Sequence, residues 1–93
     1  MPTNAERARF VWGEDGYIVG FEYRFDTGAE VMWAAIAALL AKGWFIDIEG
    51  APQRGYTVSL TSPSGHDSKP GHDALNLSAA FVAALDAAME KTP

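Results

Sequence analysis

The feature that most constrains the fold is an uninterrupted apolar run of eleven residues, from Val31 to Ala41. Residues 27–30 (Thr-Gly-Ala-Glu) have the form of a helix capping box, and Gly43 stands where a helix typically ends. A helix that is apolar on almost every side must be covered by more than one neighbour. The run is too short for the roughly 20 residues that span a bilayer, so we expect it to lie inside a folded domain.

A second alanine-rich helix is predicted near the end of the chain, starting between Asp73 and Ser78 and ending near Lys91. Its bulky side chains recur at helical spacing: Phe81, Val82, Leu85 and Met89. Small side chains on both helices allow their axes to approach closely. We therefore expect the two helices to be neighbours.

The remaining segments show the alternation of β-hairpins. Residues 9–12 and 17–25 flank a turn that contains Asp15-Gly16, and residues 44–49 and 56–61 flank the loop 50–55. The resulting order, ββαββα, predicts an α+β fold. In it, a four-stranded, mostly antiparallel sheet carries both alanine-rich helices on one face.

The length of 93 residues predicts one domain over residues 1–93, with residues 1–8 as a flexible tail and residues 62–76 as a polar loop. The chain has no cysteine, which excludes disulfides and thiolate chemistry. Its start shows no basic stretch followed by an apolar core, so we expect a cytoplasmic protein of a bacterial cell.

The net charge of −5 argues against direct binding to nucleic acid, which depends on Lys and Arg contacts to phosphates. An acidic surface favours basic partners instead. The face of the sheet without bulky core residues would present Glu22, Asp47, Glu49 and Phe45. We predict that these residues bind a partner, with Trp33 on the first helix as a further anchor.

The loop 62–76 contains two His-Asp pairs, at residues 66–67 and 72–73. Imidazole and carboxylate ligands suit zinc or iron, so a small metal-dependent enzyme that uses His66 and His72 is one alternative. The spacing matches no helical metal motif, and neighbours in one loop rarely hold the geometry of a Ser-His-Asp site. We therefore predict no metal, no cofactor and no enzymatic activity.

The order of several features resembles the phage ABA-sandwich domain family over residues 27–91. An apolar helix with a tryptophan (residues 31–35) leads to Gly43-Trp44, a Gly-aromatic-x-Val strand (residues 55–58) and an alanine-rich closing helix (residues 78–85). The resemblance implies a small phage or prophage accessory protein and transfers no functional residues. An inhibitor of a host protein or protein–nucleic-acid complex, most concretely an anti-CRISPR-like one, is the leading hypothesis. The alternative from another class is a homo-oligomeric structural protein, for example a homodimer formed through the apolar helix.

Overall fold

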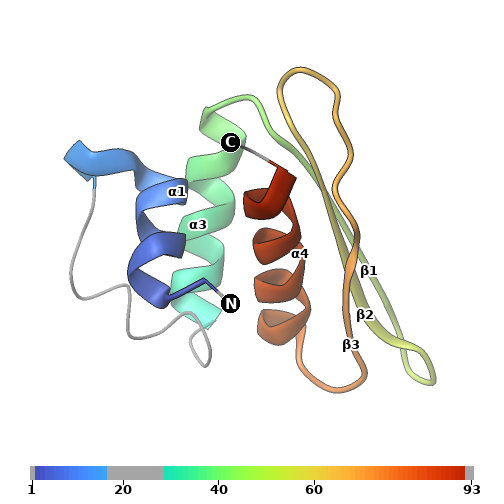
Figure 1. Ribbon diagram of the computed structural model, residues 1–93. Helices are drawn as coiled ribbons and strands as arrows, with labels where there is room; N and C mark the ends of the chain where they lie inside the picture. The colour runs from blue at the N-terminus through green and yellow to red at the C-terminus, as the bar shows by residue number, and fades with distance from the viewer. Residues whose placement is uncertain (1, 17–28, 92–93) are drawn as a thin grey trace.

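The elements of this α+β protein are stacked so that one helix lies between the sheet and the other helices (Figure 1). The computed structural model describes residues 2–16 and 29–91. In these ranges the helices are α1 (Asn4–Gly16), α3 (Ala29–Ala41) and α4 (Leu77–Lys91), and the strands are β1 (Phe45–Ala51), β2 (Gly55–Thr61) and β3 (Gly71–Asp73). None of these helices combines the length and the apolar character needed to cross a membrane.

The sheet is antiparallel, with the strand order β1-β2-β3. β1 and β2 pair without interruption, from Phe45 opposite Thr61 to Ala51 opposite Gly55. Gly55 has a φ of 78°, a left-handed conformation that favours glycine at the end of the turn. The predicted second hairpin is therefore confirmed.

The first predicted hairpin is not confirmed. Residues 9–12 belong to α1 and not to a strand, so this prediction is wrong, and residues 17–25 lie outside the described residues. In the described ranges the sheet has three strands, and neither the four-stranded sheet nor the order ββαββα is confirmed. The third strand, β3, comes from the segment that we predicted to be loop, residues 62–76.

Local hydrogen bonds explain why the N-terminal segment is helical. The amide of Glu6 donates to the hydroxyl of Thr3 over 3.1 Å, and the amide of Thr3 donates to the carboxylate of Glu6 over 3.0 Å. This reciprocal pair is a capping box, and it holds the pKa of Glu6 below its usual value. Residues 4–8, predicted as part of a flexible tail, thus form the first turns of α1. Ala8 and Val11 of this helix are fully buried.

An ion pair joins α1 to α4. The Arg7 guanidinium donates to both carboxylate oxygens of Asp86, over 2.7 Å and 2.9 Å, and also to the side chain of Asn4. Both members of the pair are largely removed from solvent. A bidentate pair of this kind fixes direction as well as distance, so it sets how α1 lies against α4.

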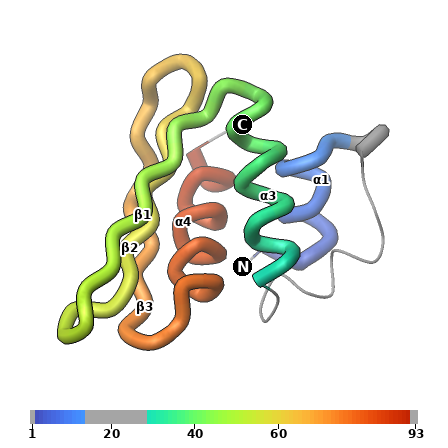
Figure 2. The backbone as a smooth tube through the Cα atoms, turned by 180° about the vertical axis from the view of Figure 1, so that it is seen from behind, coloured from blue at the N-terminus to red at the C-terminus, as the bar shows by residue number. Residues whose placement is uncertain are grey.

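Helix α4 packs on β2 and β3, and the two views show α3 and α1 on the side of α4 away from these strands (Figures 1 and 2). The prediction that both alanine-rich helices pack on one sheet face is confirmed only in part, because α3 contacts the sheet at β1 and α4 contacts it at β2 and β3. The predicted neighbourhood of α3 and α4 is confirmed.

The contact between α4 and β3 is made by the backbones themselves. A Cβ atom added to Gly71 would lie 2.1 Å from the carbonyl oxygen of Ala80 and 2.3 Å from the amide nitrogen of Ala84. Both alanines are fully buried. Any side chain at position 71 would therefore push β3 away from the helix.

The turn from β3 into α4 is fixed by two side chains. One carboxylate oxygen of Asp73 accepts the amides of Leu75 (2.9 Å) and Asn76 (2.8 Å), and the side-chain oxygen of Asn76 accepts the amide of Ala79 (3.2 Å). Asn76 is thus the N-cap of α4. The two amides lower the pKa of Asp73, so its stabilising effect is present above the pKa of the unfolded chain and is lost as the pH falls through the folded pKa.

Replacing Gly71 with Ala is expected to lower the free energy of unfolding by at least about 1–3 kcal/mol, the usual cost of overpacking. Gly50→Ala is the matched control, because its added methyl would meet only the Tyr56 ring, at 3.1 Å. That ring can turn aside, so we expect a change within about 0.5 kcal/mol. Urea unfolding measures both variants, and equal effects would contradict the close contact at Gly71.

Candidate functional site

The exposed face of the sheet, on the side away from α4, presents a continuous polar surface. Val58 and Leu60 are buried beneath α4, so the residues that alternate with them in β2 face outward. The strand register places Asp47 opposite Ser59, Glu49 opposite Thr57, and Thr57 opposite His72. We call this surface the outer sheet face; its members are Phe45, Asp47, Glu49, Thr57, Ser59, Thr61 and His72. The predicted outward residues of β1, which are Phe45, Asp47 and Glu49, do lie on this face.

The charge of the outer sheet face comes from carboxylates. Asp47 and Glu49 are both exposed, and the three strands contain no Lys or Arg. Asp67, which bridges to Thr61 beside β2, adds a third carboxylate that accepts the Thr61 hydroxyl over 2.7 Å. The surface is therefore acidic.

Phe45 begins β1 and gives the acidic surface an apolar end. Its side chain is 68% exposed, the largest exposed fraction among the aromatic side chains of the described residues. In protein–protein interfaces an aromatic side chain that becomes buried on binding can supply affinity, and flanking charges can supply specificity.

The five predicted binding residues do not form one surface. Phe45, Asp47 and Glu49 lie together on β1. Trp33 lies on α3, which α4 separates from the sheet (Figure 2), and it is 55% exposed. Glu22 lies outside the described residues.

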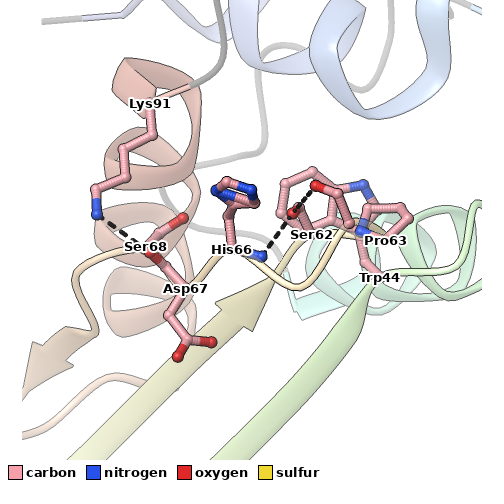
Figure 3. Close-up of a pocket in the computed structure, with 8 residues that line it drawn as sticks. Trp44, Ser62, Pro63, His66, Asp67, Ser68 and Lys91 are labelled. Carbon is pink, nitrogen blue, oxygen red and sulfur yellow. Dashed lines mark hydrogen bonds between the residues drawn. The ribbon is translucent and has the colours of Figure 1, made fainter.

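A cavity of about 540 Å³ opens beside the loop that follows β2 (Figure 3). Its lining combines hydroxyl groups, one imidazole, one ammonium group and an indole: Trp44, Ser62, Pro63, Ser64, His66, Asp67, Ser68 and Lys91. Lys91 donates to the backbone carbonyl of Asp67 over 3.1 Å. Sequence patterns did not predict this cavity, because Trp44 and Lys91 come from elements distant in the chain.

The cavity does not have the arrangement of a nucleophilic triad. The Ser62 hydroxyl accepts the backbone amide of His66 over 3.1 Å and is hydrogen-bonded to the Ser64 hydroxyl over 2.9 Å. The Asp67 carboxylate points away from the His66 ring, toward Thr61 (Figure 3). Neither the serine activation nor the histidine orientation that such catalysis requires is formed by these residues.

The two histidines occupy different surroundings. His66 lines the cavity, whereas His72 is on the outer sheet face, with its Nδ1 3.0 Å from the Thr57 hydroxyl. Over residues 2–16 and 29–91, no three His, Asp or Glu residues are grouped closely enough to hold a metal ion. The alternative of a metal site that uses both histidines has no support from this geometry.

Comparison with known proteins adds no functional assignment. No family model matches the chain, and searches of curated proteins and of solved structures give no significant match. The resemblance to the phage ABA-sandwich domain family therefore stays a prediction.

Zinc is expected not to bind one-to-one with a dissociation constant below about micromolar, which corresponds to about −8 kcal/mol. Isothermal titration calorimetry at neutral pH tests this, with the double variant His66→Ala/His72→Ala as the control. We also expect this variant to unfold at the same temperature as the wild type, because both side chains are exposed. Tight binding that disappears in the double variant would restore the metal hypothesis.

Proposed function

We propose that this protein is a small acidic inhibitor of phage or prophage type, which binds a basic surface of a host protein or protein–nucleic-acid complex. The observation that carries the proposal is the outer sheet face, where Asp47 and Glu49 lie beside the exposed ring of Phe45. The net charge of −5 supports it, because long-range attraction raises the association rate with a basic partner.

An anti-CRISPR-like role is the most concrete form of the proposal. CRISPR effectors hold their guide–target duplex in a positively charged channel. A rigid sheet face that carries carboxylates and one aromatic anchor has the charge to compete for such a channel. The same chemistry would suit other host complexes that have a basic groove.

The exposed side of α3 supports a second candidate, self-association. Trp33, Ala37 and Leu40 are spaced i, i+4 and i+7, so they lie along one side of the helix. Trp33 is 55% exposed and Leu40 is 53% exposed. A homodimer through this side would bury both large side chains.

The double reversal Asp47→Lys/Glu49→Lys is expected to weaken partner binding at least about tenfold at low salt, equivalent to about 1.4 kcal/mol. Two attractions become two repulsions, and added salt should reduce the difference by screening. The assay is inhibition of a purified guide-RNA effector, or quantitative pull-down of a host complex. Glu30→Lys/Glu90→Lys, which changes the net charge equally on the helices, is the matched control. A folded Asp47/Glu49 variant that binds like the wild type at both salt concentrations would overturn the proposal.

The self-association candidate has its own measurement. If α3 forms a dimer, Trp33→Ser/Leu40→Ser should convert the protein to a monomer in sedimentation velocity experiments. Ala37→Ser is the mild control, because it changes the same side of α3 by one hydroxyl. A wild-type protein that is monomeric at high micromolar concentration would exclude this candidate.

A further inference from the structure

Among the residues that the structure describes, β1 lies at one edge of the sheet. In the described part of the chain β1 pairs only with β2, whereas β2 pairs on both sides. β1 has seven residues, and its register with β2 is unbroken. An edge strand of this length presents a row of backbone donors and acceptors that can template a further strand.

Of the usual devices that block a sheet edge, β1 carries only charged side chains. Its sequence, FIDIEGA, contains no proline and no lysine, and its one-to-one register with β2 leaves no room for a bulge. Phe45 and Ile48 are both exposed, at 68% and 36%. The only charged side chains on the strand are Asp47 and Glu49, so the edge favours a basic strand over an acidic one.

Charge disfavours a second copy of the chain as the occupant in the pairings that use the middle of β1. In an antiparallel pair of two β1 strands, residues on the same face must stand opposite each other. The pairing centred on Ile48 places Asp47 of one copy opposite Glu49 of the other. The pairing centred on Asp47 places the two Asp47 side chains opposite each other, and the pairing centred on Glu49 does the same for the two Glu49 side chains. Like charges in directly opposed positions destabilise a strand pair.

We propose that the β1 edge binds an extended basic segment of the partner, in which Lys or Arg alternates with β-branched or apolar residues. Added as a fourth strand, such a segment places its basic side chains beside Asp47 and Glu49 and its apolar side chains beside Ile48. This inference rests on the proposed function and specifies how the partner is recognised. Main-chain hydrogen bonds supply affinity, and the alternating side chains supply specificity.

The probe is a fluorescent peptide of the same length as β1, in which lysine alternates with valine. The control peptide has the same composition, with the lysines together at one end. Fluorescence anisotropy should show the alternating peptide binding at least about tenfold more tightly than the control, because only alternation places every lysine on one face. Equal binding of the two peptides, or no binding of the alternating one, would overturn the inference.

Methylation of the peptide backbone distinguishes strand addition from simple docking on the face. In a paired edge strand, alternate amides point toward the neighbouring strand. N-methylation of the peptide amides that point toward β1 should abolish binding. N-methylation of the alternate amides, which point away from β1, should leave the dissociation constant within a few-fold of that of the unmethylated peptide. Loss at every position, or at none, would contradict strand addition.

Hydrogen exchange of the protein provides an independent measurement. Alternate β1 amides should exchange rapidly in the free protein and slow at least about tenfold when the peptide is bound. If all β1 amides are already protected in the free protein, the edge is occupied and the inference is wrong. It is equally wrong if the peptide binds without protecting them.

Neutral variants separate this inference from the proposed function. Asp47→Asn/Glu49→Gln should weaken binding of the alternating peptide at least about tenfold, and Glu30→Gln/Glu90→Gln should not. If the neutral variant loses partner binding while the peptide fails every edge test, the acidic face binds without strand addition. If peptide binding survives the neutral change, charge is not the basis of recognition and the inference fails.

Discussion

The backbone contact between β3 and α4 at Gly71 is the constraint on which the arrangement of the layers depends. Because no side chain separates the strand from the helix, α4 lies close enough for Ala80 and Ala84 to be fully buried. The larger residues Phe81 and Leu85 are fully buried on the same helix and fill the core around this contact. α4 therefore serves two layers, covering the sheet on one side and supporting α1 and α3 on the other (Figure 1).

Strong periodic patterns predicted the parts of the fold with many apolar side chains. The alternation of apolar and polar residues indicates which side chains of β1 and β2 face outward. Helix α3 ends where the sequence predicts it to end, just before Gly43, which has a φ of 93°. β3 was missed because its three residues, Gly-His-Asp, carry no apolar pattern: Gly71 contributes by having no side chain. The strand was set by tertiary contact, which local sequence does not encode.

The error at α1 has a different cause. Residues 10–12 (Phe-Val-Trp) are aromatic or β-branched, which favours a strand in isolation. The Thr3–Glu6 capping box and the Arg7–Asp86 ion pair outweigh that preference, and Thr-x-x-Glu was a visible signal in the sequence. For the candidate site, alternation located Asp47, Glu49 and Phe45 correctly but gave no information about the cavity or about which strand lies at the edge.

The narrow sheet links the fold to its proposed role. In the part of the chain that the structure describes, the helices pack on one face of the three strands, so the other face and the β1 edge are left for solvent or for a partner. The same two carboxylates, Asp47 and Glu49, act in opposite directions there: they repel a second copy of the strand and attract a basic one. Charge repulsion is the protection of this edge against pairing with a second copy. A basic strand is attracted by the same carboxylates, so this protection does not act against it. Avoidance of aggregation and recognition of a partner are then consequences of one pattern of charge on one strand.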